Sequence, residues 1–178
     1  MRIIGAEQIT QTVAELCIKA NICVGDDIYS AIKRHRQNET LDTARFVLDA
    51  LMENADVAKS NKLPICQDTG MAVVFVTIGN NVHINGDIHE AVNEGVRLGY
   101  KNGYFRSSVV SDPIRRINTG DNTPAVIYAD FMPGDDISIT VAPKGFGSEN
   151  MSGVRMLSPS DGLSGIAYDV APFIPSFQ

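Results

Sequence analysis

Apolar residues recur every three or four positions in four stretches of the chain, the spacing that places one apolar face along a helix. These stretches predict helices over residues 9–20, 26–36, 40–61 and 87–103. The first carries its apolar stripe from Ile9 through Cys17 to Ala20, so we expect it to face the core. Thr40 is the expected N-cap of the longest helix, and Gly103 suits the end of the last.

Strand patterns lie between and after these helices, in stretches rich in β-branched and aromatic residues. Residues 71–78 form the longest such stretch, and a turn of glycine and asparagine separates it from residues 82–84, which predicts a hairpin. Residues 125–131 and 136–142 predict a second, antiparallel hairpin across the turn at 132–135. The sequence therefore predicts an α+β fold, with a helical N-terminal region followed by antiparallel hairpins and a further helix.

Two polar stretches interrupt this periodicity. Residues 61–70 contain Pro64 and Gly70, which break a helix, and they lead directly into the first long strand. Residues 107–123 are longer, and an irregular segment of that length inside a folded domain is usually functional.

The composition narrows the class of protein. With 44% hydrophobic and 20% charged residues, the 178-residue chain is typical of a folded globular protein. Its net charge of −6, with no basic patch larger than residues 33–36, argues against a nucleic-acid partner. There is no apolar run of membrane-spanning length and no apolar leader behind Met1, and the three cysteines are odd in number. We therefore expect a cytoplasmic protein without disulfides and without a membrane partner.

The loop before the first long strand contains a thiol next to a carboxylate, in Cys66-Gln67-Asp68. A thiolate suits zinc, copper or an iron-sulfur cluster, and the adjacent amide and carboxylate could orient a polar substrate. The alternative is a buried loop cysteine beside an aspartate that forms an Asx turn. One cysteine cannot chelate a metal by itself, so the motif alone leaves both interpretations open.

A glycine-rich segment, residues 144–150, follows the last predicted strand. Its glycines allow the backbone to approach a ligand, its N–H groups could cradle an anion, and Lys144 adds positive charge. It lacks the ending of a phosphate-binding P-loop, and Asn150 stands where a dinucleotide motif has its third glycine. A phosphate cradle and a plain turn both remain as alternatives.

Arg106 directly follows the end of the last predicted helix. Its planar guanidinium offers a fork of donors that suits a carboxylate group. The alternative is an ordinary solvated surface arginine.

Four segments, taken together and in order, resemble the alpha part of class I fumarases and tartrate dehydratases. They are residues 63–70, 106–108, 118–125 and 144–150. The most specific are Cys-Gln-Asp-Thr-Gly at 66–70 and Lys-Gly-x-Gly-Ser-x-Asn at 144–150, and the resemblance extends from about Ile9 to Met156. It implies an oxygen-sensitive hydro-lyase subunit that hydrates or dehydrates a four-carbon dicarboxylate, converting fumarate to malate or tartrate to oxaloacetate.

The resemblance also implies a cofactor and partners. The cofactor is a [4Fe–4S] cluster with three cysteine ligands, whose fourth iron acts as a Lewis acid on the substrate. Cys66 would be one ligand, and Asp68 would bind substrate and act in catalysis. The other implied substrate-binding residues are Gln67, Arg106, Lys144, Gly145 and Gly147. The implied partners are the dicarboxylate and a fumarase-type beta subunit or domain, in an oligomer.

One departure from the family pattern bears on activity. Family chains carry two further cluster cysteines beyond the Lys-Gly-x-Gly segment, whereas no cysteine follows Cys66, and both Cys17 and Cys23 precede it. We therefore predict an incomplete alpha domain over residues 1–160, and an atypical tail over 161–178 that lacks the helical continuation of the family.

Such a chain would be inactive alone and would self-associate through exposed apolar surface. The alternative is a non-catalytic dicarboxylate-binding or assembly module that has lost the cluster.

Overall fold

The computed structural model describes residues 1–147 and 153–170. It divides into two compact units, Met1–Gly145 and Phe146–Gln178, which are described separately. The elements of the first unit are β1 (Arg2–Gly5), α1 (Ala6–Ile22), α2 (Asp26–Asn38), α3 (Asp42–Asn61), β2 (Met71–Gly79), β3 (Val82–Asn85), α4 (Ile88–Asn102), β4 (Val126–Met132) and β5 (Ile137–Lys144). The second unit contains a short 3₁₀ helix, η2 (Pro159–Asp161), and α5 (Gly162–Val170). These elements confirm the predicted α+β class.

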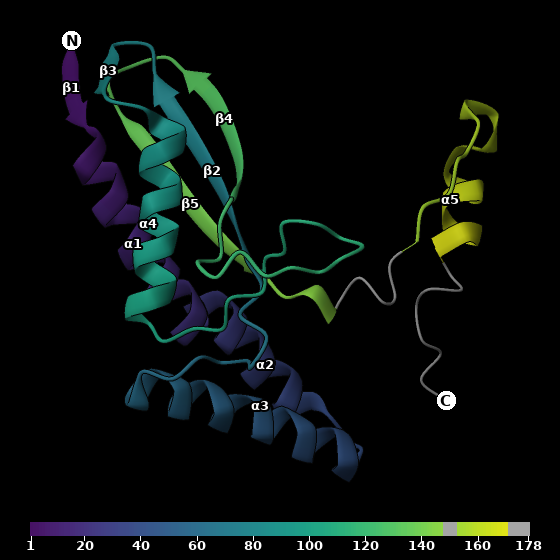
Figure 1. Cartoon of the computed structure of the whole chain (residues 1–178). Helices are drawn as coiled ribbons and strands as arrows, with labels where there is room; N and C mark the ends of the chain where they lie inside the picture. Colours follow the sequence, from purple (N-terminus) through teal and green to yellow (C-terminus); the bar gives the residue numbers. More distant parts are fainter. Residues whose placement is uncertain (148–152, 171–178) are drawn as a thin grey trace. The chain divides into compact units, whose positions relative to one another are not determined.

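Helices α1 and α4 lie side by side and cover one face of the sheet that β2, β4 and β5 form (Figure 1). Glycines on α4 allow this close approach, because a Cβ atom at Gly95 or Gly99 would lie 2.7 Å from side-chain atoms of α1. Apolar side chains of the two helices and of β2 fill the space between them. The core residues with the lowest exposure include Ile9, Val13, Cys17, Val74, Val76, Val92 and Val96.

Strand β2 is central in the sheet, whose order is β4-β2-β5. It pairs in parallel with β4 and antiparallel with β5. The predicted hairpin of residues 125–131 with 136–142 is therefore wrong, since β2 lies between the two strands. The physical reason is that β2 is an uncharged, largely apolar strand of nine residues, so both of its edges are best paired within the sheet. The edge positions fall to β4, which carries Asp130 within it, and to β5, which Asp136 directly precedes.

The predicted hairpin between residues 71–78 and 82–84 is also wrong. Strand β3 pairs in parallel with β1, which the sequence pattern did not indicate, in a register that places Arg2 opposite Val82. The turn after β2 bonds to the turn between β4 and β5 instead of closing a hairpin: the N–H groups of Gly79, Asn80 and Asn81 donate to carbonyl oxygens there, at 2.8, 2.9 and 2.9 Å. These three bonds direct the chain away from β2.

The helix positions agree with the sequence pattern, with one difference at an N-terminus. Helix α3 begins at Asp42 after Leu41, so Thr40 is not its N-cap as predicted. The carboxylate of Glu39 accepts the N–H groups of Thr40 and Leu41, at 2.7 and 2.9 Å, and so fixes the turn before the helix, whose N-cap Leu41 makes no side-chain capping bond. Gly103 does stand at the C-terminus of α4, as expected.

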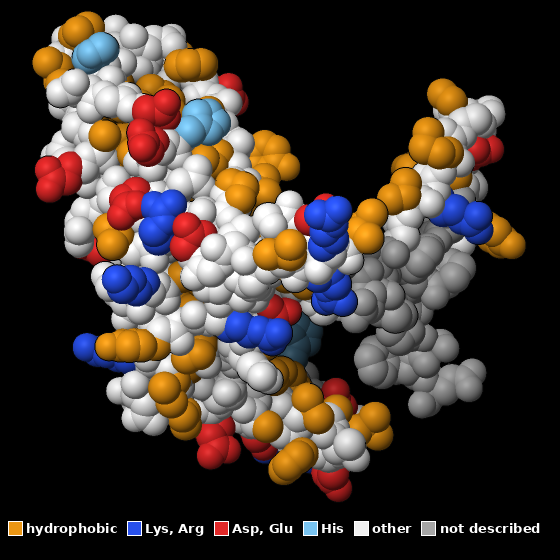
Figure 2. All heavy atoms as spheres, in the orientation of Figure 1, with side chains coloured by type: hydrophobic (Ala, Val, Ile, Leu, Met, Phe, Trp, Pro, Cys, Tyr) orange, Lys and Arg blue, Asp and Glu red, His pale blue; other side chains and the backbone are white. Residues whose placement is uncertain are grey.

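Helices α2 and α3 pack on each other as a pair (Figure 1), and little of the pair is buried. No residue of α2 is buried, and α3 buries only Ala55 and Ala58. Both oxygens of the Asp49 carboxylate accept hydrogen bonds from the Arg36 guanidinium at 2.8 Å, which joins the two helices. Apolar side chains lie on the surface of this helix pair (Figure 2). Phe46 of α3 is 72% exposed. The predicted self-association of the chain stays a prediction.

The predicted atypical tail, residues 161–178, contains a helix, and its lack of the family's helical continuation stays a prediction. Helix α5 covers Gly162–Val170, and residues 171–178 lie outside the described residues. The helical turn η2 leads into α5, with Pro159 in its first turn and the Asp161 carboxylate accepting the N–H of Ser158 at 2.7 Å.

Within the part of the chain that the structure describes, no helix combines the length and the apolarity needed to cross a lipid bilayer.

Candidate active site

The sheet topology brings the motif segments to one end of the sheet. Strands β2 and β4 are parallel and both begin at this end, while β5 is antiparallel to β2 and finishes there. The loop over residues 62–70 leads into β2, the segment 118–125 leads into β4, and Lys144 is the last residue of β5. Segments separated by up to about 80 residues in sequence therefore meet because of strand order alone.

The loop that carries Cys66 is held at its start by the helices beneath it. Lys62 adopts a left-handed conformation, with φ of 54°, and ends α3. The N–H of Ile65 then donates to the carbonyl of Asn21 at the end of α1, at 2.9 Å, and the Ile65 carbonyl accepts from the Asn54 side chain at 2.9 Å. Cys66, which follows directly, is exposed, as is Gln67.

Asp68 and Gly70 connect this loop to the end of β5. The Asp68 carboxylate accepts the N–H of Gly70 at 3.1 Å, which is the Asx turn considered from the sequence. Gly70 has φ of +59°, and a Cβ atom there would lie 1.8 Å from the Lys144 carbonyl oxygen. The other carboxylate oxygen of Asp68 faces Gly145, where a Cβ atom would lie 3.2 Å from it. Glycine at position 70 therefore permits the contact between the loop and the end of β5.

Arg106 is fixed to the same loop through its backbone. The Thr69 hydroxyl donates to the Arg106 carbonyl at 3.0 Å, and the Thr69 carbonyl accepts from the Tyr100 hydroxyl at 2.8 Å. Burial raises the pKa of Tyr100 to about 12, so its hydroxyl remains a neutral donor at physiological pH. The Arg106 side chain is exposed, and its guanidinium makes no ion pair within residues 1–147 and 153–170. An exposed guanidinium of this kind is available to a carboxylate ligand.

Asn122 connects three of the motif segments. Its side chain is fully buried, and its Oδ1 accepts the N–H groups of Ser108 and Val109 at 2.7 and 3.2 Å. Its Nδ2 donates to the carbonyl of Gly70 at 3.1 Å. The sequence pattern included this residue only as part of a polar motif, since burial of an asparagine leaves no periodic signal. The Gly-Asp-Asn-Thr-Pro run around it indicates a turn, and a turn residue is expected at the surface.

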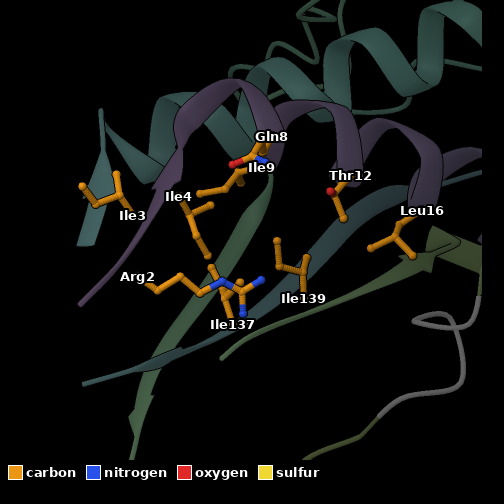
Figure 3. A pocket seen from close by; sticks show the side chains of 9 residues that line it. All are labelled: Arg2, Ile3, Ile4, Gln8, Ile9, Thr12, Leu16, Ile137 and Ile139. Atoms are coloured by element: carbon orange, nitrogen blue, oxygen red, sulfur yellow. The ribbon is translucent and has the colours of Figure 1, made fainter. Parts of the chain in front are cut away.

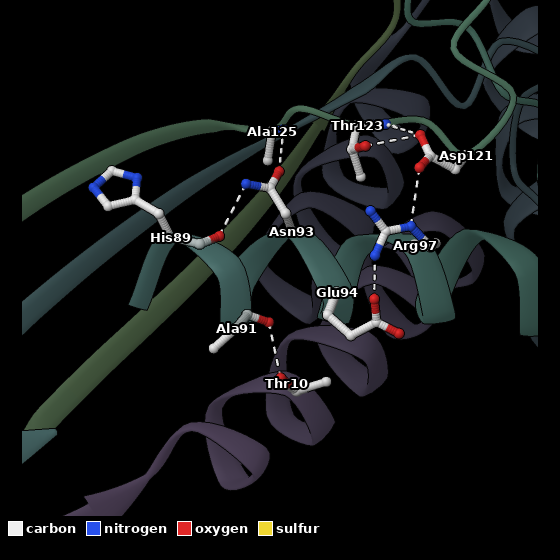
Figure 4. A network of polar contacts seen from close by, with 9 residues as sticks. All are labelled: Thr10, His89, Ala91, Asn93, Glu94, Arg97, Asp121, Thr123 and Ala125. Carbon is white, nitrogen blue, oxygen red and sulfur yellow. Dashed lines mark hydrogen bonds and ion pairs between the residues drawn. The ribbon is translucent and has the colours of Figure 1, made fainter. Parts of the chain in front are cut away.

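The segment before β4 is also held to α4 by charge (Figure 4). The Arg97 guanidinium donates to Asp121 at 2.9 Å and is paired with Glu94 on its own helix. The second oxygen of Asp121 accepts from the N–H and the hydroxyl of Thr123, at 3.0 and 2.8 Å. The bond from Arg97, followed by those from Thr123, lowers the pKa of Asp121 to about 2.

The glycine-rich segment is described only in part. Lys144 and Gly145 end the first unit beside Asp68, and Gly147 belongs to the second unit. Residues 148–150, the rest of the motif, lie outside the described residues. The predicted contributions of Gly147 and of the full segment to an anion site therefore stay predictions.

The thiols of this chain do not fit a complete [4Fe–4S] ligand set. Among the residues that the structure describes, no three side chains of His, Cys, Asp or Glu are grouped so that they could hold a metal ion. Cys17 is fully buried in the core, and burial raises its pKa to about 12, so it is a protonated thiol at neutral pH. Cys23 lies at the end of α1 and is partly buried. Cys66, exposed on the site loop, fits as a single ligand.

Two of the surface hollows in the first unit differ in their position relative to the motif residues. One, of about 450 Å³, lies between α1 and β5 (Figure 3) and is lined by side chains that include Arg2, Ile4, Gln8, Leu16 and Ile139. No motif residue lines it. The other, of about 410 Å³, includes Tyr100, Ser107 and Asp121 and therefore adjoins the motif segments. The second hollow is thus lined by both sequence neighbours of Arg106, while Cys66, Asp68, Arg106 and Lys144 line neither hollow.

Fold and site together define an α+β protein with a cluster of polar loops at one end of a mixed sheet, one face of which is covered by two helices. The chain belongs to the fumarate hydratase (Fumerase) family, whose model matches residues 10–177.

Three relatives illustrate the family's range. A putative L(+)-tartrate dehydratase subunit alpha from Methanocaldococcus jannaschii is 36% identical over 165 residues, which is 89% of this chain and 58% of that protein. Fumarate hydratase 2 from Leishmania major is 33% identical over 114 residues, 63% of this chain and 20% of that protein. The L(+)-tartrate dehydratase subunit alpha from Escherichia coli K12 is 25% identical over 166 residues, 91% of this chain and 54% of that protein. The chain therefore spans little more than half the length of the tartrate dehydratase relatives.

Proposed function

We propose that this chain is part of a hydro-lyase that adds or removes water across a four-carbon dicarboxylate, as the names of its fumarate hydratase and tartrate dehydratase relatives suggest. The observation that carries the proposal is the meeting of the Cys66–Gly70 loop, Arg106 and the end of β5 at one end of the sheet. A dicarboxylate needs positive charge to bind, and Arg106 and Lys144 supply it in an otherwise acidic chain.

The site residues have distinct functions in this proposal. Arg106 binds one substrate carboxylate, and Lys144 adds positive charge at the end of β5. Gln67 and Asp68 contact the substrate or its hydroxyl, with Asp68 as the catalytic carboxylate. The backbone at Gly145 can lie close to the substrate because no side chain intervenes. For Gly147 the same assignment rests on motif resemblance alone.

The proposed cofactor is a [4Fe–4S] cluster, which when bound would supply a Lewis acid for the hydroxyl and carboxylate of the substrate. Cys66 would provide one thiolate ligand, and the other ligands would come from polypeptide outside these 178 residues. A relative named as an alpha subunit supports assembly with a beta subunit in an oligomer. The chain alone is then expected to be inactive.

The test is an anaerobic assay of fumarate hydration and L-tartrate dehydration, after reconstitution with iron and sulfide, with and without a beta-type subunit. Replacing Arg106 by alanine removes charge-assisted hydrogen bonds to the substrate, so kcat/KM should fall roughly 10- to 100-fold. Arg34→Ala is the matched control, because Arg34 is an exposed arginine on α2 outside the site. Absence of turnover of both substrates with the subunit present, or equal effects of the two substitutions, would overturn the proposal.

A non-catalytic dicarboxylate-binding or assembly module is the second candidate. The observation in its favour is the single thiol at the site, which cannot hold a cluster without further protein. Calorimetric titration with fumarate, malate and tartrate, in the absence of iron, separates the two candidates. Tight, Arg106-dependent binding without any turnover in the complete assembly would favour the second.

A further inference from the structure

Asn122 is placed so that one amide group bonds to both sides of the candidate site. On one side it accepts the N–H groups of Ser108 and Val109, two and three residues after Arg106. On the other it donates to the carbonyl of Gly70, which follows the Cys66–Asp68 segment. The side chain has 0% exposure, so water does not compete for these bonds.

The position favours asparagine over other residues for two reasons. The backbone has φ of 60°, a left-handed conformation that asparagine, aspartate and glycine tolerate best. The site also requires an acceptor for two N–H groups and a donor for a carbonyl within one short side chain. Aspartate at neutral pH keeps the acceptor and loses the donor, and glycine loses both.

The N–H groups of Ser108 and Val109 both find their acceptor in Asn122. The hydroxyl of Ser108 is buried and has no hydrogen-bond partner within the described part of the chain. Asn118, which reaches the carbonyl of Ser107, does so at the surface, where water competes for the bond. The carbonyls of Arg106 and Val109 accept bonds from Thr69 and Thr119. The N–H groups of Ser108 and Val109 bond to Asn122, so Asn122 is the acceptor that restrains these two N–H groups.

We propose that Asn122 is a positioning residue that sets the spacing between the Arg106 side and the Asp68 side of the dicarboxylate site, an inference that rests on the function proposed above. It touches no reacting atom in this scheme and acts through the backbone of Gly70 and of Ser108. A displacement of about 1 Å in catalytic groups can cost roughly 100-fold in rate, so a restraint shared by both sides of a site has a measurable effect.

Two substitutions of Asn122 test its bonds to the Arg106 side and to the Asp68 side of the site separately. Asn122→Gly keeps the left-handed backbone without strain and removes all three bonds. Asn122→Asp keeps the acceptor for the N–H groups of Ser108 and Val109. It places a carboxylate oxygen against the Gly70 carbonyl, so only the hydrogen bond to Gly70 is lost. Asn81→Asp, at an exposed turn, is the matched control for the change of an asparagine to a charged residue.

The first measurement is amide hydrogen exchange on the full chain, which requires no cluster and no activity. Asn122→Gly should accelerate exchange at Ser108 and Val109 about tenfold or more, because both N–H groups lose their acceptor. Asn122→Asp should leave these two amides near the wild-type rate and accelerate exchange in the segment 66–71. Asn81→Asp should change neither.

The second measurement is a split between KM and kcat in the assembled enzyme, with L-tartrate and fumarate as substrates. Asn122→Asp should keep KM near wild type, because the Arg106 side remains held, and lower kcat about 10- to 100-fold. Asn122→Gly should raise KM and lower kcat together. A stability loss alone would not produce this difference between the two variants.

The results that overturn the proposal are specific. Folded Asn122→Gly protein with wild-type exchange at Ser108 and Val109 would show that the amide does not restrain this backbone. Equal shifts of KM and kcat in both variants would show that Asn122 is structural only. If the assembled wild-type protein turns over neither substrate, the function proposed above fails, and the exchange data still decide whether Asn122 couples the two segments.

Discussion

Replacing Gly70 by alanine tests whether the contact between the site loop and the end of β5 is as close as described. An alanine Cβ would lie 1.8 Å from the Lys144 carbonyl oxygen, so the two backbones would have to separate by about 1.6 Å to restore a 3.4 Å contact. The left-handed conformation adds about 1–2 kcal/mol for a residue with a Cβ atom. Loss of the bond from Asn122 and of the adjoining β2 to β5 pairing adds about 1 kcal/mol each.

We therefore expect Gly70→Ala to lower the free energy of unfolding by about 3–4 kcal/mol, measured by urea denaturation. Gly120→Ala is the matched control, since Gly120 also has a positive φ, of 84°, but no atom lies within 4 Å of the added Cβ. It should cost only the conformational part, about 1–2 kcal/mol. Equal losses in the two variants would refute the steric reasoning.

Three further predictions concern the thiols and the charged network. Under native conditions a thiol reagent such as DTNB should modify the exposed Cys66 first, in a fast phase of the reaction, and the buried Cys17 only on unfolding. Cys66→Ser should remove this fast phase. A fast phase that survives the substitution would place the reactive thiol elsewhere. Because burial raises the pKa of Cys17 from 9.0 to about 12, the unfolded state releases this proton first as the pH rises. Stability should therefore be lost between about pH 9 and 12, and Cys17→Val should make the fall in melting temperature shallower; an unchanged slope would contradict the assignment. Because the bond from Arg97 lowers the pKa of Asp121 from 3.8 to about 2, its contribution should be complete above pH 4 and lost as the pH falls toward 2. Asp121→Asn should weaken the acid dependence in that window, and a melting profile identical to that of wild type would count against it.

Local patterns predicted the helices and the position of the motif loops, but not the strand pairing. A helix such as α4 is specified by residues three and four apart, and its Asp87 cap and Gly103 end are visible in the sequence. Strand partners are set by residues more than 40 positions apart, as for Val73 opposite Val126, and no local signal distinguishes a hairpin from insertion of a third strand. The four-residue strand β1 is too short to show any periodicity.

For the candidate site, too, the sequence indicated which residue types take part, but not how the fold places all of them. The sequence indicated Cys66, Asp68, Arg106 and Lys144 by residue type and motif order, and the structure brings their segments together. It could not indicate that Asn122 is buried, because burial here results from the junction of three loops and not from a periodic face.

The central place of β2 also has a consequence for synthesis of the protein on the ribosome. Both neighbours of β2 are made after it: β4 ends at Met132 and β5 at Lys144, which is 65 residues beyond Gly79. At about 5–20 residues per second, this uncharged strand waits roughly 3 to 13 s for its second edge partner. During that interval its backbone groups are open to other nascent chains, so chaperone binding in this window should improve the yield of folded protein.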